Sequence, residues 1–471
     1  MISAPRNRFE LPERLHFVGI GGIGMSGLAE MALAHGCRVS GSDLRFSART
    51  RRLQSLGAVI ARGQHPAHLF LLGAPPNWVV VSSALSTDNT EVVAAHAQGF
   101  FLMHRSELLA QFFNGRVGVG VTGTHGKTTV SALLTTVLAC AGLDPTAVVG
   151  GVMAALGTNV RLGQTPYVVA EADESDGSFL KLAPHFAVVT NIDSDHMSHW
   201  GDMAALVRAF RKFMQSARGQ VIVCDDDAAA LQAAAGLKAI TYGLSPRAHY
   251  YAQNIEHEGF SSRFVAYRQG EALTPVELPL IGRHNVQNAM AAVALAGELN
   301  IPFDRVARAL SSFEGVGRRF SLVGKLGQGD HEMLIADDYA HHPAEIRATL
   351  SGIKAAFPQR RLVVLFQPHR YSRTSELFDE FATAFSDADV LFVADIYTAD
   401  ESPLDGIDST ALAQRIYEKG HPSVHYICPV TAHNVLRACR PGDIILTMGA
   451  GDIYELGPEL LAQAQREYRT R

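Results

Sequence analysis

The sequence lacks the features of secreted and membrane proteins. Only five cysteines occur among its 471 residues, at positions 37, 140, 224, 428 and 439, and none forms a CxxC pair. So few cysteines do not make a disulfide framework, so we expect scattered buried thiols in a reducing compartment. No apolar run reaches the roughly 18 residues of a membrane span, and the start, MISAPRNRFELPER, has no apolar core of a secretory signal. These absences predict a cytoplasmic protein without membrane insertion.

An excess of charge of one sign is also missing. The chain has 41 Lys and Arg against 46 Asp and Glu, a formal net charge of −5. A general binder of nucleic acid or anionic membranes needs a large positive field, so we expect no nucleic-acid partner. Repeats of 20–50 residues and low-complexity tracts are absent as well.

The chain contains ample apolar material, 47% of its residues, and a length of roughly three domains. Short β-branched runs alternate with helical stretches rich in Ala and Leu, which is typical of α/β proteins with parallel sheets. The expected strands are 15–20, 37–43, 77–85, 116–121, 166–173, 186–193, 220–225, 333–341, 360–369, 390–397 and 443–451, with helices at 29–36 and 130–142. We place the domains at 1–108, 109–320 and 321–471.

A first glycine loop follows the first expected strand. It reads Gly19-Ile20-Gly21-Gly22-Ile23-Gly24, a GxGxxG pattern that leads into a helix. Such glycines let the backbone approach a diphosphate at the helix N-terminus. Asp43, at the end of the next strand, would face a ribose or base edge. The alternative is a glycine-rich turn that binds nothing.

A second loop, Gly123-Thr124-His125-Gly126-Lys127-Thr128-Thr129, also lies between a strand and a helix. Its backbone N–H groups would cradle phosphates, Lys127 would contact the terminal phosphates and the Thr128 hydroxyl would bind Mg²⁺. The full GxxxxGK[ST] pattern has Gly where this chain has Val121. The GTxGKTT core nevertheless predicts an enzyme driven by ATP.

Acidic residues follow two later strands and offer metal ligands. They are Glu171 and Asp173 after one strand, and Asp193, Asp195 and His196 after the next. The carboxyl ends of parallel strands meet at one edge of a sheet, which favours a Mg²⁺ site for the set over separate loop caps.

Eight motifs in order resemble the Mur ligases, the ATP-dependent amide-forming enzymes of peptidoglycan precursor synthesis. They are GIGGIGMSGLA (19–29), VTGTHGKTT (121–129), EADESD (171–176), TNIDSDHMSHW (190–200), GRHNVQNAMAA (282–292), DDYAHHPAEI (337–346), FQPHRYSRT (366–374) and MGAGDIY (448–454). The resemblance covers nearly the whole chain. It implies an α/β protein with a Rossmann-like N-terminal domain, a P-loop-type central ATP-binding domain and a Rossmann-like C-terminal domain.

The resemblance also implies a reaction. ATP phosphorylates the carboxylate of a nucleotide sugar, and an amine displaces phosphate from the acyl phosphate. The loop GIGGIGMSG and the run FQPHRYSRT favour the branch that joins L-alanine to UDP-N-acetylmuramate. The alternative branch recycles muropeptides by attaching a tripeptide to the same sugar. The implied partners are these small molecules and ATP, and a monomer or weak homodimer is expected.

For ATP and metal, the resemblance implies that Lys127 stabilises the transferring phosphate. Thr128 and Glu171 would ligate one Mg²⁺, and Glu171 and His196 a second. His196 must be neutral to bind metal, so its affinity should fall at acid pH. The implied ATP-binding set is Gly123, Thr124, His125, Gly126, Lys127, Thr128, Thr129, Asn285, Asn288, Arg319 and Asp338. Asn288 has a competing interpretation as a helix cap.

The other two substrates are assigned in the same way. The implied UDP-sugar set is Gly19, Gly21, Gly22, Ile23, Gly24, Asp43, His65, Ser82 and Ser83. The implied amino-acid set is Tyr339, His341, His369, Arg370 and Arg373. The two arginines would bind a carboxylate or the acyl phosphate with their guanidinium forks. Of the adjacent His341 and His342, we expect His341 to act, together with Lys127, His196, Arg370 and Arg373, in catalysis.

One departure separates the chain from sister ligases that add later residues. Those enzymes carry a carbamate-forming lysine some fourteen residues after an Asp-His pair that corresponds to Asp195 and His196. This chain has Phe210 at that position. We therefore expect no carbamate ligand. Two other classes of protein fit the sequence less well. A dehydrogenase would leave the GKTT loop at 126–129 unexplained. A non-catalytic scaffold would need neither the pair Asp195-His196 nor the HRxxR motif at 369–373.

Overall fold

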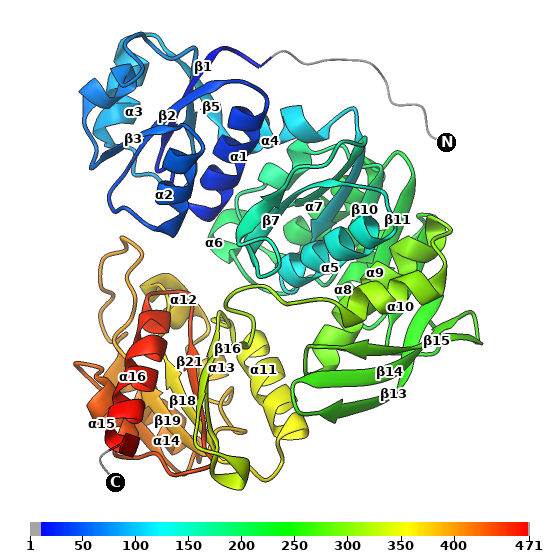
Figure 1. Ribbon diagram of the computed structural model, residues 1–471, viewed down its shortest axis with the longest axis vertical. Coiled ribbons are helices and arrows are strands. Elements are labelled where there is room, and N and C mark those ends of the chain that lie inside the picture. Colours follow the sequence, from blue (N-terminus) through cyan, green and yellow to red (C-terminus); the bar gives the residue numbers. More distant parts are fainter. Residues whose placement is uncertain (1–10, 470–471) are drawn as a thin grey trace. The chain divides into compact units, whose positions relative to one another are not determined.

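The structure is a computed structural model that describes residues 11–469. The first ten residues, part of the segment considered above for a secretory signal, lie outside the described part. The chain divides into two compact units. The first holds the chain up to Asn254 with Phe264–Glu277 and Gln287–Glu314, and the second holds Ile255–Arg263, Leu278–Val286 and the chain from Gly315. Figure 1 shows the sheets and helices of each unit.

The first sheet of unit 1 has five parallel strands in the order β3-β2-β1-β4-β5. They are β1 Arg14–Val18, β2 Arg38–Asp43, β3 Val59–Arg62, β4 Trp78–Val81 and β5 Phe101–His104, with helices α1 Ile23–Ala34, α2 Ala48–Ser55, α3 Thr90–Ala97, α4 Arg105–Phe113 and the 3-10 helix η1 Pro66–Phe70. Leu15 and Phe17 face one core, while Val18 and Val79 belong to another. This two-sided burial is the Rossmann-like arrangement that the sequence predicts.

The second sheet has ten strands in the order β15-β14-β13-β12-β11-β10-β6-β9-β7-β8. Their bounds are β6 Val117–Thr122, β7 Thr146–Met153, β8 Thr158–Arg161, β9 Tyr167–Glu171, β10 Phe186–Val189, β11 Gln220–Cys224, β12 Ala239–Gly243, β13 Tyr250–Glu258, β14 Ser261–Arg268 and β15 Glu271–Leu278. The central strand β6 pairs in parallel with β10 and β9. The loops that follow these three strands therefore meet at one edge, as expected for the site.

The helices of this region include α5, which packs against β6, β7 and β9. The helices are α5 Lys127–Cys140, α6 Met197–Trp200, α7 Met203–Gln215, α8 Ala228–Ala234, α9 Arg283–Glu298, α10 Phe303–Ser311 and the 3-10 helix η2 Ser178–Lys181. On the amphipathic α7, Phe210 and Phe213 are fully buried. Phe210 lies among apolar residues of the core.

Unit 2 contains the third sheet, in the order β16-β17-β21-β18-β19-β20, with only β16 antiparallel to its neighbour. The strands are β16 Ser321–Leu326, β17 Met333–Asp338, β18 Leu362–Phe366, β19 Val390–Val393, β20 Val424–Tyr426 and β21 Ile444–Met448. The helices are α11 Pro343–Ala356, α12 Tyr371–Glu376, α13 Phe378–Phe381, α14 Ser409–Glu418, α15 Ala432–Leu436 and α16 Leu456–Arg469, with the 3-10 helices η3 Gly329–His331 and η4 Ile453–Glu455. Strands β18 and β19 are apolar and buried along their whole length, because helices cover both faces of the sheet there.

The alternation along β18 shows this burial directly. Leu362, Val364 and Phe366 face the core made with α11, α13 and α14. Val363 and Leu365 face the opposite core, made with α15 and α16. Figure 1 shows α11 and α16 on the two sides of this sheet.

The three-domain α/β fold is confirmed, with small shifts at element ends. The expected strand 77–85 is too long, because β4 ends at Val81 and Leu85 N–H donates to the Ser82 carbonyl in a turn. Helices α1 and α5 begin earlier than expected, directly at the glycine loops. The domain boundaries near 108 and 320 stay a prediction.

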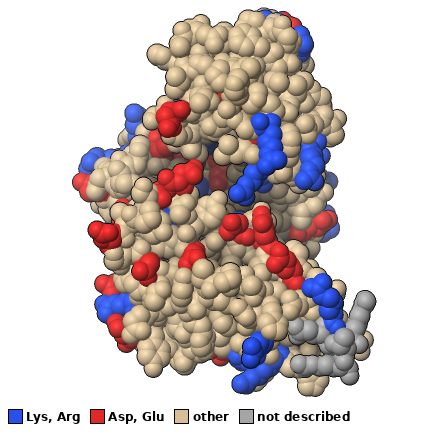
Figure 2. Space-filling view, turned by 90° about the vertical axis from the view of Figure 1, so that its left-hand side faces the viewer, with Lys and Arg blue, Asp and Glu red and all other residues tan. Residues whose placement is uncertain are grey.

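Two further features concern the surface. On the face shown in Figure 2, basic and acidic side chains both occur, and neither covers an extended continuous area. Within residues 11–469, no helix has both the length and the apolar character required to cross a bilayer.

Candidate active site

The second glycine loop connects β6 to α5 in a left-handed backbone conformation. Gly123 has φ +138° and Gly126 has φ +83°. Side chains are also excluded by space, because a Cβ on Gly126 would lie 2.5 Å from Asn288 Oδ1. The loop therefore requires glycine at both positions, and Asn288 lies directly against it, while its role in ATP binding stays a prediction.

The segment after β10 holds the loop in place. Thr124 N–H donates to the Asn191 carbonyl over 3.1 Å, and His125 N–H donates to Asn191 Oδ1 over 2.8 Å. The Thr190 hydroxyl donates to the His125 carbonyl over 2.6 Å. These bonds shape the phosphate loop before a nucleotide arrives, which lowers the ordering cost of binding.

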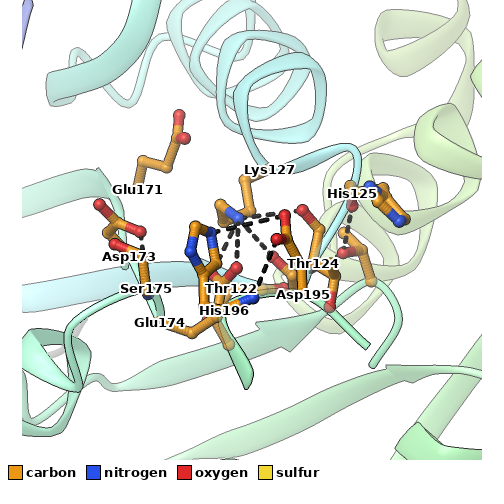
Figure 3. A network of polar contacts seen from close by, with 12 residues as sticks. Thr122, Thr124, His125, Lys127, Glu171, Asp173, Glu174, Ser175, Asp195 and His196 are labelled. Atoms are coloured by element: carbon orange, nitrogen blue, oxygen red, sulfur yellow. Dashed lines mark hydrogen bonds and ion pairs between the residues drawn. The ribbon is translucent and has the colours of Figure 1, made fainter. Parts of the chain in front are cut away.

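Lys127 is the first residue of α5, and its ammonium is enclosed by acceptors. Nζ donates to the carbonyls of Gly123 (2.6 Å) and Thr124 (3.1 Å) and to Glu174 Oε1 (2.9 Å). Figure 3 shows Lys127 turned toward this group, with Glu174 beneath it. The lysine is thus held at the phosphate loop by an internal carboxylate.

Three ionisable groups around the loop influence one another. Burial lowers the pKa of Lys127, but Glu174, Asp173 and Glu171 outweigh it and raise that pKa overall. Burial raises the pKa of Glu174 to about 7, against the attraction of Lys127. Burial also acts to raise the pKa of Asp173, yet Lys127 and Arg105 hold it at about 2. A permanent positive charge therefore lies at the predicted position of the terminal phosphates.

Thr128 and Glu171 lie side by side, as a shared metal site requires. Thr128 Oγ1 donates to Glu171 at 3.0 Å from Oε2 and 3.2 Å from Oε1. The Gly150 N–H also donates to Oε2 over 2.8 Å. A hydroxyl and a carboxylate beside a phosphate loop are the oxygen donors that Mg²⁺ prefers, so these residues fit the ion.

The remaining acidic candidates do not form one ligand set. Asp173 pairs with Arg105 over 3.0 Å, and Asp193 lies 3.1 Å from His125 Nε2. Asp195 Oδ1 accepts from the His196 N–H, and His196 itself has φ +58° at the start of α6. Asp173 and Asp193 thus each have a charged or ionisable partner in the protein, and the interpretation of the five residues as metal ligands stays a prediction.

The two asparagines of RHNVQN lie in α9. Asn288 is 8% exposed, and Asn285 Nδ2 donates to the Ile281 carbonyl over 2.8 Å. This bond ties the Asn285 side chain to the chain just before α9, and its predicted contact with ATP stays a prediction. Thr129, also predicted at ATP, is buried in the first turn of α5.

The first glycine loop is closed by Asp43. Gly21 N–H donates to Asp43 Oδ2 over 2.8 Å, and Arg45 N–H donates to Oδ1 over 3.1 Å. Gly19 adopts φ +74°, and Gly22 caps α1, whose first residues are Ile23 and Gly24. Asp43 therefore braces the loop, and its contact with a ribose stays a prediction.

His65 and Ser83 lie in other loops of the same sheet, and a hydrogen bond to a carboxylate fixes the position of each. His65 N–H donates to Glu91 Oε1 over 3.0 Å, and the Ser83 hydroxyl donates to Asp176 Oδ2 over 2.9 Å. Glu91 is fully buried and also accepts from Ser42 (2.7 Å). Ser82 precedes the turn to Leu85.

In unit 2, Asp338 joins two segments. Its Oδ2 accepts from Phe320 N–H (2.7 Å) and its Oδ1 from Ala340 N–H (2.8 Å). Burial raises the pKa of Asp338 to about 6, although Arg319 opposes the shift. Arg319 lies over the Tyr339 ring at 5.3 Å. Asp338 thus links the chain at Phe320 to the end of β17, and its predicted contact with ATP stays a prediction.

The predicted amino-acid residues of the HRxxR motif also gather in unit 2. His369 stacks on Tyr397, with ring centroids 5.4 Å apart, and its Nδ1 lies 3.4 Å from Arg373 Nη1. Burial, followed by His341 and the nearby arginines, lowers the pKa of His369 to about 3. Arg370 caps α12 with φ +73° and Arg373 lies one turn on, so the two guanidiniums start from one helix end.

The adjacent histidines have different surroundings. His342 is 1% exposed and caps α11, where its Nδ1 accepts from the Ala344 N–H. His341 Nδ1 lies 3.0 Å from the Tyr339 carbonyl, and its ring is 6.2 Å from that of His369. The helix cap explains His342, which favours His341 as the residue of the pocket.

Sequence reasoning missed Glu174, Arg105 and Arg318. Arg318 lies between the Tyr339 and Tyr454 rings, at 4.9 and 4.4 Å, and bonds to the Gly451 carbonyl over 3.2 Å. Glu174 stands inside the EADESD motif, so the motif was the available signal. Nothing in the local sequence distinguishes Arg105 or Arg318 from a surface arginine.

Models of the Mur ligase family match most of the chain. The Mur ligase family catalytic domain matches residues 14–116, the Mur ligase middle domain residues 121–296, and the Mur ligase glutamate ligase domain residues 318–451. Together they contain both glycine loops and the HRxxR motif.

Full-length relatives point the same way. A UDP-N-acetylmuramate–L-alanine ligase of Anaeromyxobacter sp. (strain Fw109-5) is 48% identical over 455 residues, 96% of this chain and 97% of that protein. One of Geobacter sp. (strain M21) is 46% identical, covering 95% and 97%. The crystal structure of the UDP-N-acetylmuramate–alanine ligase of Thermotoga maritima superposes with a TM-score of 0.82 at 28% identity, covering 96% of this chain and 99% of that one.

Proposed function

This chain belongs to the Mur ligase family, and from that premise we propose that it joins L-alanine to the carboxylate of UDP-N-acetylmuramate, with ATP converted to ADP and phosphate. The observation that carries the proposal is the 48% identity over 96% of the chain to a ligase of that name. The braced phosphate loop with Lys127 supplies the chemistry that such a ligase needs.

A carboxylate is a poor electrophile, so the reaction begins with its phosphorylation. The loop N–H groups and the Lys127 ammonium neutralise the charge of the transferring phosphate. Thr128 and Glu171 would hold Mg²⁺, which adds positive charge at the phosphate oxygens when it is bound. We assign a second Mg²⁺ to Glu171 and His196. ADP leaves and the sugar carboxylate carries the phosphate.

The second step forms the amide. Arg370 and Arg373 would bind the alanine carboxylate, since paired guanidiniums suit a carboxylate. The amine then attacks the acyl carbon and phosphate departs. His341, Tyr339 and the neutral ring of His369 would form the small pocket around the amino acid. The sugar nucleotide would lie on Gly19–Gly24, and we propose that the reaction takes place in the cytoplasm.

The test is phosphate release from ATP and Mg²⁺ with UDP-N-acetylmuramate. Parallel reactions contain L-alanine, L-serine, glycine, the tripeptide L-Ala-γ-D-Glu-diaminopimelate, or no amine. Release that requires both the sugar and L-alanine supports the proposal. Release with the tripeptide alone would assign the chain to muropeptide recycling, and no release in any reaction by folded protein that binds ATP would contradict a ligase.

Lys127→Met should lower the rate at least about 100-fold, because it removes the charge at the transferring phosphate. The matched control is Lys181→Gln. Lys181 is an exposed lysine that pairs with Glu107 over 3.0 Å, away from the loop. That variant should keep the wild-type rate, and an equal loss in both would refute the assignment of Lys127.

A further inference from the structure

The six-residue segment Glu171–Asp176 contacts the phosphate loop directly and reaches the first glycine loop through Arg105. Glu171 and Glu174 bond to Thr128 and Lys127 of the phosphate loop. Its other two carboxylates, Asp173 and Asp176, bond to residues around the five-stranded sheet. A short irregular stretch after β9 therefore links the predicted ATP site to the predicted UDP-sugar site.

The first link is the pair of Asp173 and Arg105. Asp173 Oδ2 accepts from Arg105 Nη2 over 3.0 Å. The second terminal nitrogen of the guanidinium, Nη1, lies 3.4 Å from where a Cβ on Gly24 would be. Gly24 is in the first turn of α1, and that first turn contains no acidic residue. Asp173 thus holds a positive charge against the loop to which the diphosphate is assigned.

The second link is Asp176. Its Oδ2 accepts from the Ser83 hydroxyl over 2.9 Å and lies 3.9 Å from His104 Nε2. Ser83 follows β4, and His104 ends β5 and caps α4. Asp176 therefore fixes the loop after β4 that carries Ser82 and Ser83, two of the predicted UDP-sugar contacts.

We propose that Glu171–Asp176 couples the two substrate sites, with Asp173 and Asp176 as positioning residues for Arg105 and Ser83. The inference rests on the proposed function. When a phosphate of ATP binds the Lys127 ammonium, Glu174 loses its bond to that ammonium, and Glu171–Asp176 changes position. Asp173 is adjacent to Glu174 and Asp176 is two residues away, so the readjustment reaches Arg105 and Ser83. Linkage requires that UDP-sugar binding act equally on ATP binding.

The experiment measures this linkage by calorimetry on the full chain. The Kd of UDP-N-acetylmuramate is determined alone and with saturating Mg²⁺ and a non-hydrolysable ATP analogue. For wild type we expect the analogue to tighten sugar binding at least about 5-fold, the lower end of typical coupling. Asp173→Asn should bring the ratio to within 2-fold of one. Ser83→Ala removes the hydroxyl that bonds to Asp176 and should lower the ratio in part, since the loss of a direct sugar contact would weaken both Kd values alike and leave their ratio unchanged.

Lys181→Gln is the matched control, because it removes another 3.0 Å ion pair, between η2 and Glu107 of α4, and leaves the Asp173–Arg105 and Asp176–Ser83 bonds in place. It should keep the wild-type ratio. A wild-type ratio near one, or an Asp173→Asn or Ser83→Ala variant that retains the full ratio, would overturn the coupling. Wild-type protein that binds neither ligand would instead contradict the proposed function, so the two failures differ.

Discussion

At the scale of single residues, the phosphate loop depends on glycine for two reasons, and Gly126→Ala tests both. The alanine would adopt φ +83°, which costs roughly 1–2 kcal/mol, and its Cβ would lie 2.5 Å from Asn288 Oδ1. We expect a lower free energy of unfolding and at least about a 10-fold weaker Kd for ATP, since a shifted Asn288 and loop no longer fit the nucleotide. Urea unfolding and calorimetry measure the two effects.

Gly115→Ala is the control that separates the backbone strain from the contact with Asn288. Gly115 has φ +82°, and a Cβ there would meet nothing within 4 Å. Its backbone strain is equal, so the stability loss should be similar while the ATP affinity stays unchanged. Equal losses of affinity in both variants would show that Asn288 and the loop geometry do not matter.

A second residue-scale prediction concerns His369. Its folded pKa of about 3 lies below the ordinary histidine value of 6.5, so below pH 6.5 the unfolded chain binds a proton that the folded chain does not. Stability is then lost as the pH falls from 6.5 toward 3. From pH 7 to pH 5.5 this group should remove about 1 kcal/mol from the free energy of unfolding.

His369→Gln should remove that part of the pH dependence, measured by urea unfolding at both pH values. The exposed His425 of β20 serves as the control, and His425→Gln should leave the wild-type difference intact. A His369 variant with the full wild-type difference would contradict a neutral, partly buried His369 ring.

At the scale of elements, the start of α11 separates two neighbouring histidines. His342 caps the helix and its side chain is buried. His342→Ala should therefore cost about 1–2 kcal/mol of stability, while His342→Asn should recover part of it because Asn is a good cap. Neither should change the KM for L-alanine much, whereas His341→Ala should raise that KM. Thermal unfolding and steady-state kinetics distinguish the two roles, and the opposite pattern would exchange the two assignments.

At the scale of the whole molecule, three substrates are assigned to three domains, which predicts closure on binding. The chain divides into two compact units with separate cores, so rigid-body motion is the ordinary expectation. We expect the radius of gyration from small-angle scattering to fall when an ATP analogue, UDP-N-acetylmuramate and L-alanine are all present. Lys127→Met with the same ligands should show a smaller change, and an unchanged wild-type radius would count against closure.

The sequence by itself determined the order of elements and the chemistry of the loops. Alternating apolar runs predict the strands, since a strand covered on both faces must be apolar throughout. Gly126 and Lys127 predict a phosphate site because the backbone conformation and the charge are properties of those residues. Asp43 at the end of β2 was likewise predictable from local pattern.

Only the tertiary structure decided which partner each side chain meets. Asp173 and Asp193 have the same local signature as Glu171, yet they face Arg105 and His125 instead of Thr128. Arg105 reaches Asp173 across 68 residues of chain. No local pattern encodes such pairs, because they arise when separate strands and helices pack and bring distant charges within a few ångströms.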